Sequence, residues 1–237
     1  AAAGALAAMG LAGCAPTPAA EGSTKTAETG IAATSWRDKP EMPTEFVETV
    51  DADIVVVGAG NGGLVAATTA AQNGAKVVVL EKAGAIAAAR EAIGALNSKL
   101  APDHQEDVPT LLNHANQTQA GDANMLMYKT WAEKSGEMIE WMADTLGPKG
   151  MLFPFEWHCP DDPHAYYPAM CYNPCIGEYN PDGPNYNSYA HLEVMRDVFT
   201  GDLGGEIRFE CPAQQLVIDE SGRVTGVVAE GKEGFIQ

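Results

Sequence analysis

The chain lacks any hydrophobic run long enough to cross a bilayer, and it is poor in basic residues. Fourteen lysines and arginines stand against thirty-two aspartates and glutamates, which gives a formal net charge of -18. A transmembrane helix needs about 20 predominantly apolar residues, and nucleic acids are bound through basic patches. These two shortages argue against a membrane-spanning protein and against a nucleic acid as the partner.

Cysteine is also scarce, with five residues in the whole chain. Four of them lie in the second half, at Cys159, Cys171, Cys175 and Cys211. Their spacing matches no zinc-binding pattern, even with His158 and His164 nearby, so we expect no metal site. Four cysteines allow three disulfide pairings, among which the sequence does not choose. Buried free thiols are the state we expect.

The first residues are small and apolar, and residues 11–14 read LAGC, which resembles a bacterial lipobox. We therefore expect residues 1–14 to be the end of a secretory signal, with Cys14 lipidated. The protein would then be exported to the cell surface or periplasm and anchored to the membrane. The alternative is a low-complexity tail with an incidental cysteine. Residues 15–50 lack hydrophobic periodicity and predict a disordered tether.

What the chain does contain is a glycine-rich turn within residues 53–82, DIVVVGAGNGGLVAATTAAQNGAKVVVLEK. Residues 54–57 are β-branched and apolar, which is typical of a buried strand in a parallel sheet. Residues 64–73 predict a helix that Gly74 ends, and residues 76–80 predict a second strand. The order strand, turn, helix, strand is the beginning of a dinucleotide-binding domain.

Gly58, Gly60 and Gly63 form a G-x-G-x-x-G motif directly after the first strand. The first glycine permits the tight turn, the second lets a pyrophosphate approach, and the third lets the helix pack on the strand. The free N–H groups of the helix N-terminus favour the phosphates. Glu81 ends the second strand, where a carboxylate can hold ribose hydroxyls, and it favours FAD or NAD over NADP. An ordinary glycine turn in an unrelated α/β protein is the alternative.

The segment after Glu81 is rich in small residues and leaves the second strand where a cofactor would lie. Small side chains allow close approach of the backbone, and Arg90 could reach a phosphate. The alternative is an alanine-rich helix with a solvated Arg90, because alanine is the best helix former.

The remainder predicts helices, then strands. The helices are expected over residues 107–120, 123–146 and 189–203, and the strands over 207–210, 213–219 and 223–230. The last two strands form a hairpin in a β-meander.

Residues 151–190 contain more than half of the aromatic residues and show no periodicity. We expect a long irregular segment there. It either lies against the cofactor ring or a substrate entrance, or forms a rigid covering loop packed by its own side chains.

A βαβ unit followed by helices and a meander resembles the FAD-binding domain of the FAD-dependent oxidoreductase 2 family. This family is fumarate reductase/succinate dehydrogenase flavoprotein-like and includes ketosteroid dehydrogenases and urocanate reductases. The resemblance covers residues 51–237, including WAEKSGEMIEWMADTLG at 131–147 and CPAQQLVIDESGRVTGVVA at 211–229. It implies an α/β, Rossmann-like domain of the glutathione-reductase type with a helical insert and a β-meander. It also implies that the domain is incomplete, truncated before the capping domain.

By this resemblance the chain binds FAD. Residues 60–63 would approach the pyrophosphate, Glu81 would hold the adenosine ribose, and Ala213 would meet the adenine through its backbone. The implied cofactor contacts are Gly58, Gly60, Asn61, Gly62, Gly63, Glu81, Lys82, Arg90, Gly94, Ala95 and Ala213. Many family members carry Gly-Gly-Asn-Ser where residues 88–91 read AARE. The proton-donating arginine of the family would lie beyond Gln237, so no catalytic residue is carried over.

The resemblance implies an FAD-dependent oxidoreductase that reduces an activated C=C bond of a small organic acid. The electron donor is left open between a cytochrome, a quinol-linked and a soluble donor, and we expect the isolated 237 residues to be inactive. Alternatives are a 3-ketosteroid dehydrogenase-like flavoenzyme, an NAD-linked dehydrogenase and a nucleotide-binding lipoprotein without turnover. Plain NAD domains continue with alternating strands and helices, which counts against the NAD-linked alternative.

Overall fold

A computed structural model describes residues 41–86, 92–118, 121–122, 124–158, 169–177 and 190–237. Every helix and strand below lies within residues 43–237, which form one unit. The lipobox with Cys14, residues 15–40 of the predicted tether, Arg90, Cys159 and His164 lie outside the described residues. Within the described part of the chain, no helix has the length and apolar character that a membrane span requires.

The predicted βαβ unit is present and carries the glycine turn. Strand β1 (Ile54–Val57) leads into helix α1 (Asn61–Gln72), and strand β2 (Val77–Leu80) returns parallel to β1. Strand β8 (Glu206–Arg208) pairs in parallel with the other side of β2, so the sheet order is β1-β2-β8. Helix α1 begins three residues earlier than predicted, because the glycines that weaken helix propensity occupy its first turn.

The burial of β1 differs from the prediction. All four residues of β2 are buried, whereas Ile54, Val55 and Val57 are 41%, 37% and 59% exposed. The reason is topological. Strand β2 has a strand on each side, while among the described residues no strand pairs with the outer edge of β1.

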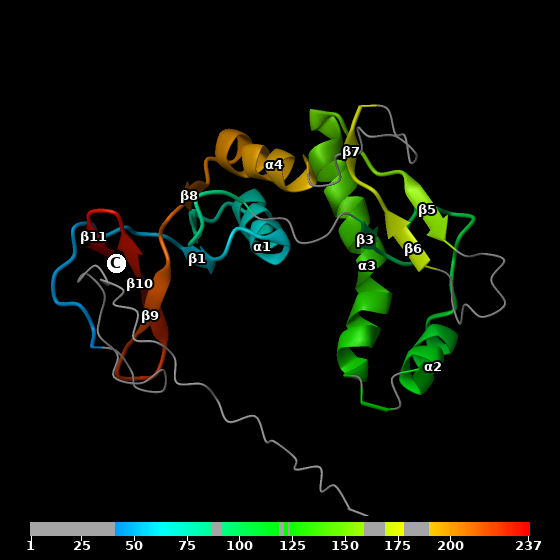
Figure 1. Ribbon diagram of the computed structural model, residues 1–237, viewed down its shortest axis with the longest axis horizontal. Coiled ribbons are helices and arrows are strands. Elements are labelled where there is room, and N and C mark those ends of the chain that lie inside the picture. The colour runs from blue at the N-terminus through cyan, green and yellow to red at the C-terminus, as the bar shows by residue number, and fades with distance from the viewer. Residues whose placement is uncertain (1–40, 87–91, 119–120, 123, 159–168, 178–189) are drawn as a thin grey trace, which may run out of the picture. The chain divides into compact units, whose positions relative to one another are not determined.

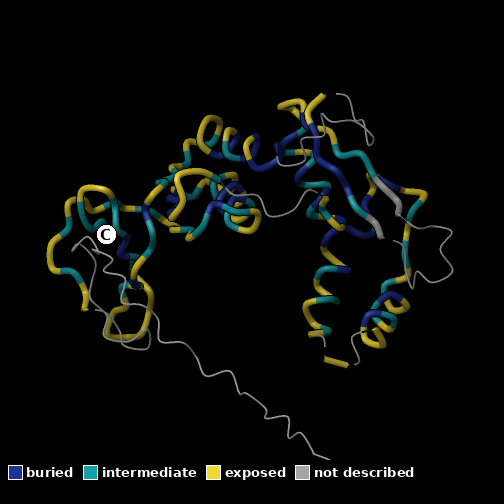
Figure 2. The backbone as a smooth tube through the Cα atoms, in the orientation of Figure 1, coloured by how far each residue is buried: buried dark blue, intermediate teal, exposed yellow. Residues whose placement is uncertain are grey.

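The helical part agrees with the sequence pattern. Helix α2 spans Val108–Thr118, and α3 spans Met125–Leu146 and continues into a 3-10 turn, η1 (Gly147–Lys149). Helix α4 (Ala190–Asp197) runs into a π-helical turn, η2 (Val198–Asp202). Figure 1 shows α4 beside α1, although the two are far apart in sequence. The first turn of α3 is exposed (Figure 2).

We predicted an irregular segment over residues 151–190. This prediction is wrong for the described part of the segment, which forms short strands. These are β4 (Met151–Leu152), β5 (Phe155–His158), β6 (Ala169–Tyr172) and β7 (Cys175–Ile176). Strand β6 pairs antiparallel with β5 and with β3 (Ile93–Gly94), and β4 pairs with β7. Strands of two to four residues are too short for a visible alternation, and the pairing with β3 is not encoded locally.

The chain then forms the predicted meander of β9 (Ala213–Ile218), β10 (Val224–Gly231) and β11 (Gly234–Ile236). Residues 47–50, the end of the segment predicted as a tether, lie beside β11. The Val47 N–H donates to the Phe235 carbonyl and the Val50 N–H to the Gln237 carbonyl, each at 2.8 Å.

Two groups of buried side chains stabilise the parts that carry the site. The larger one joins α1, β2, α3, α4 and η2 and includes Leu64, Val79, Ile139, Met195 and Phe199. The smaller one joins β2 to the meander through Leu80, Cys211 and Ala229. Apolar burial of this kind contributes about 25 cal/mol per Å².

Candidate functional site

The glycine turn between β1 and α1 is shaped by one positive φ and one close approach. Gly58 has a φ of +97°, a conformation that side chains rarely adopt. A Cβ at Gly63 would lie 1.8 Å from the carbonyl oxygen of Gly58, so the helix contacts the turn at backbone distance. Both positions therefore require glycine, as the motif predicts.

The N-terminus of α1 offers hydrogen-bond donors to a ligand. Gly60 is the N-cap residue and supplies no side-chain cap, and the first turn carries no acidic residue. The first N–H groups of a helix have no partner within the helix, and the helix dipole adds partial positive charge there. This end of α1 is therefore suited to an anion such as a phosphate.

Glu81 connects the turn to the end of β2. The N–H of Ala59 donates to its Oε2 and the N–H of Ala83 donates to its Oε1, each at 2.8 Å. Burial is the largest influence and raises the pKa of Glu81, but the N–H groups of Ala59, Ala83 and Lys82 together with the Lys82 charge outweigh it. The pKa lies below its usual value, and the carboxyl group is ionised near neutral pH. Each oxygen has a further lone pair for a ligand hydroxyl.

A cavity of about 290 Å³ lies at this carboxylate. Its walls are Val57, Gly58, Leu80, Glu81, Lys82, Pro212 and Ala213. Four of the residues predicted to contact the cofactor therefore meet in one place, although Ala213 is far from the others in sequence.

Backbone hydrogen bonds bring Ala213 to this cavity. The Glu81 N–H donates to the Arg208 carbonyl at 2.8 Å, and the Cys211 N–H donates to the Glu81 carbonyl at 2.9 Å. The Glu210 N–H donates to the Ala83 carbonyl at 3.0 Å. The loops that follow β2 and β8 are thereby held side by side, and β9 starts at the cavity.

Asn61 lies at a second cavity, of about 200 Å³, with His191 of α4. The ring Nε2 of His191 is 2.9 Å from Oδ1 of Asn61, and His191 is 1% exposed. No local sequence signal links His191 to Asn61, because the two are 130 residues apart.

Gly94 and Ala95 do not line either cavity. Gly94 lies in β3, and its carbonyl accepts a hydrogen bond from Nε1 of Trp131 at 3.0 Å. Ala95 is 1% exposed and packs in the larger core.

Two of the described cysteines are buried free thiols, as we expected. Cys175 and Cys211 are free and buried, and burial raises the pKa of each thiol. A raised pKa keeps a thiol protonated and unreactive. In the part of the chain that the structure describes, no three His, Cys, Asp or Glu side chains are grouped to hold a metal ion.

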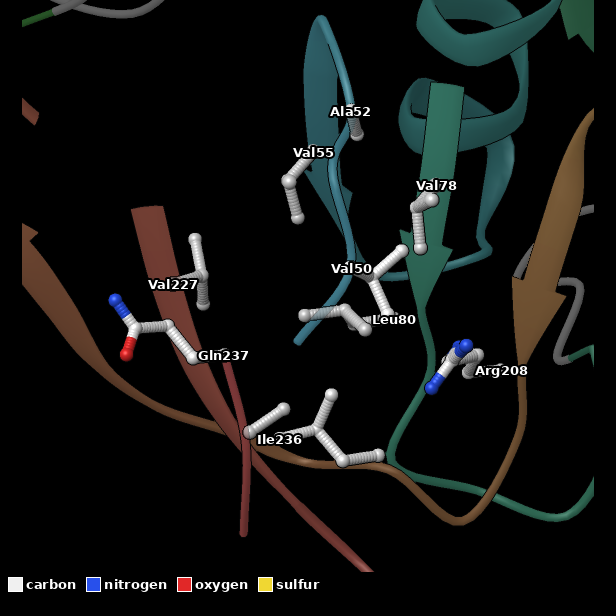
Figure 3. Close-up of a pocket in the computed structure, with 10 residues that line it drawn as sticks. Val50, Ala52, Val55, Val78, Leu80, Arg208, Val227, Ile236 and Gln237 are labelled. Carbon is white, nitrogen blue, oxygen red and sulfur yellow. The ribbon is translucent and has the colours of Figure 1, made fainter. Parts of the chain in front are cut away.

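A third, small cavity of about 30 Å³ is lined mostly by apolar side chains between the parallel sheet and the meander (Figure 3). Val55, Val78 and Leu80 face Val227 and Ile236 there, and Arg208 lies at one side. The cavity shares Val78, Leu80 and Ala229 with the smaller core.

Comparison with known proteins identifies the family. A family model described as FAD binding domain matches residues 53–234. The chain belongs to this family of FAD-dependent oxidoreductases. FAD is thus the cofactor, and the NAD-linked alternative loses its support.

Two curated relatives come from Eggerthella lenta. Digoxin reductase is 30% identical over 233 residues, which cover 93% of this chain and 39% of the relative. Urocanate reductase is 42% identical over 59 residues, which cover 24% of this chain and 10% of the relative. The chain thus spans less than half the length of these two relatives.

Solved structures share the fold. A 3-ketosteroid-Δ4-(5α)-dehydrogenase from Rhodococcus jostii RHA1 superposes with a TM-score of 0.64 at 21% identity, covering 81% of this chain and 44% of that one. A flavocytochrome c3 fumarate reductase gives 0.59 at 20% identity, covering 81% and 32%. At these identities the likeness shows a common mixed α/β fold.

The residues present fit the adenosine diphosphate half of FAD. A glycine turn with no room for a Cβ at Gly63 lies beside an ionised, buried Glu81. Gly58, Glu81 and Ala213 line the same cavity. FAD supplies hydride transfer when it is bound, and the protein's part is to bind and orient it.

Proposed function

We propose that this protein reduces an activated C=C bond of a small organic acid, using FAD held at the glycine turn. The observation that carries the proposal is the single cavity around Gly58, Glu81 and Ala213 in a chain of this family. The names of the relatives support the direction of the reaction, because digoxin reductase, urocanate reductase and fumarate reductase are all named as reductases.

In this proposal each part of the site has a separate role. The N–H groups at the start of α1 bind the pyrophosphate, to which Gly60, Asn61, Gly62 and Gly63 contribute. Glu81 accepts hydrogen bonds from the ribose hydroxyls, and the backbone of Ala213 contacts the adenine. Lys82 lies at the rim, where its charge favours a phosphate. Arg90 and Gly94 would be reached by the remainder of the cofactor, whereas Ala95, which is buried in the larger core, would support the backbone beside Gly94.

A 3-ketosteroid dehydrogenase-like activity is the second candidate. The solved dehydrogenase from Rhodococcus jostii RHA1, in complex with 4-androstene-3,17-dione, superposes with the higher of the two TM-scores. A steroid and a small acid differ in charge and size, so direct assay distinguishes them.

We also propose that the protein is exported and anchored through a lipidated Cys14. The support is the LAGC run after an apolar segment. Metabolic labelling with a radioactive fatty acid tests it. Label in the wild type and none in Cys14→Ser is expected, and equal label in both would contradict the proposal.

The first experiment is an absorption spectrum of the whole protein, followed by acid release of the ligand. Bands of oxidised flavin and released FAD are expected. Oxidation of reduced methyl viologen by fumarate, urocanate or digoxin detects a reductase activity, and reduction of an electron-acceptor dye by a 3-ketosteroid detects a dehydrogenase activity. A flavoprotein that reduces none of the acids but oxidises a 3-ketosteroid would overturn the small-acid proposal. Turnover of fumarate by the isolated 237 residues would contradict their expected inactivity.

A further inference from the structure

Asn61 and His191 meet at the first turn of α1, and the contact joins two elements that are remote in sequence. Oδ1 of Asn61 lies 2.9 Å from Nε2 of His191. His191 is 1% exposed and lies on α4 among apolar neighbours, whereas Asn61 is exposed. The histidine is therefore fixed by packing, and the asparagine can reach an arriving ligand.

The chemistry of the pair determines which group of Asn61 remains available. An amide oxygen only accepts hydrogen bonds, so Nε2 of His191 donates to it. The amide NH₂ of Asn61 then keeps its two donors for other partners. A flexible asparagine that is held by its oxygen cannot turn that oxygen toward an anion.

The composition of the first turn makes this side chain distinctive. Residues 61–64 are Asn-Gly-Gly-Leu, and the N-cap is Gly60. Asn61 is thus the one polar side chain among residues 60–64, at the end of the helix where a phosphate is favoured.

We propose that His191 is a positioning residue, which orients Asn61 so that its NH₂ group donates to a phosphate of the dinucleotide at the start of α1. The inference rests on the proposed FAD site and adds a specific donor to it. The packing of α4 against α1 would then contribute to phosphate affinity as well as to stability.

The test measures binding of FAD, ADP and adenosine to the full chain by titration calorimetry. ADP carries two phosphates and adenosine carries none, so the pair of probes isolates the phosphate contact. We expect His191→Leu to weaken ADP about tenfold, the loss of one charge-assisted hydrogen bond, and to leave adenosine unchanged. His191→Gln, which retains an N–H donor, should restore ADP affinity to within about threefold of wild type.

Asn61→Ala provides an independent test at an exposed position. We expect the same loss for ADP, and no further loss when His191→Leu is added, since the two residues act as one unit. Equal ADP affinity in wild type and Asn61→Ala would overturn the inference, as would a parallel loss of adenosine. Either result would leave the proposed function standing, because the wild type would still bind FAD. A wild type without affinity for FAD or ADP would overturn the proposed function and this inference together.

Discussion

The N–H of Ala59 donates to Oε2 of Glu81 at 2.8 Å, which joins the middle of the glycine turn to the end of β2. The other carboxylate oxygen accepts from Ala83. The residue expected to hold the ribose therefore also holds the turn that faces the pyrophosphate. Stability and cofactor affinity should depend on the same carboxylate.

Glu81→Gln tests this double role. The amide keeps one acceptor oxygen, loses the charge and places an NH₂ group against a backbone N–H. We expect FAD affinity to fall by about tenfold to a hundredfold, because hydrogen bonds to charged groups contribute about 1.5–3 kcal/mol. Quenching of flavin fluorescence measures the affinity. Glu137→Gln, which changes an exposed carboxylate of α3, is the control and should bind FAD as the wild type does.

The lowered pKa of Glu81 predicts an acid-sensitive fold. A carboxyl group with a depressed folded-state pKa adds stability above its unfolded pKa, and this stability is lost as the pH falls through the folded value. Urea midpoints of the wild type should therefore fall between about pH 5 and pH 3, and those of Glu81→Gln should fall less. Parallel curves for the two proteins would exclude Glu81 as the titrating group.

Two adjacent glycines should respond oppositely to alanine. A Cβ at Gly63 would meet the Gly58 carbonyl oxygen, whereas at Gly62 no atom lies within 4 Å. We expect Gly63→Ala to destabilise the protein by more than about 3 kcal/mol. Gly62→Ala should be neutral or stabilising by up to about 1 kcal/mol, because alanine favours helix. Chemical unfolding of both variants measures the difference, and equal values would show that the close approach does not matter.

Arg208 holds residues 47–50 through Glu48, to which its Nη2 donates at 2.8 Å. This hydrogen bond is the main cause of the lowered pKa of Glu48. We expect Arg208→Leu to accelerate amide exchange at Val47, Val50 and Gln237 severalfold, since the bridge is partly exposed. Hydrogen–deuterium exchange measures this. Arg196→Leu, which removes an exposed arginine paired with Asp197, should leave these amides unchanged.

Trp131 should matter for the order of β3. Its Nε1–H donates to the Gly94 carbonyl at 3.0 Å, and Trp131→Phe removes that bond. We expect a loss of about 1 kcal/mol and faster exchange in β3 and β6. In Trp141→Phe the lost partner is Oε1 of Gln72 instead. We expect Trp141→Phe to lose a similar amount of stability without faster amide exchange in β3. Faster exchange in β3 in both variants would point to a general effect of removing a tryptophan.

Local patterns predicted the βαβ unit, the helices and the meander because their signals lie within short stretches. The G-x-G-x-x-G motif specifies its own turn, and the buried strand β2 shows as a continuous apolar run. The exposure of β1 was not predicted, because burial depends on which strands become neighbours. The apolar run alone predicts that β1 is a strand, but it does not specify which strands lie on either side of it.

The parts of the site that the sequence missed depend on long-range pairing. Strand β6 pairs with β3 on one side and β5 on the other, and the contact of His191 with Asn61 brings α4 to α1. Neither feature has a local signal. The convergence of Gly58, Glu81 and Ala213 was available only through the resemblance to a family.

The pairing of residues 47–50 with the end of the meander joins segments that are almost the entire described chain apart. Closing so long a loop costs entropy before any hydrogen bond is gained, so this contact should form late in folding. During synthesis, residues 47–50 leave the ribosome long before their partner strand exists. The nascent FAD site can therefore assemble first, with the N-terminal segment added to a domain that is already folded.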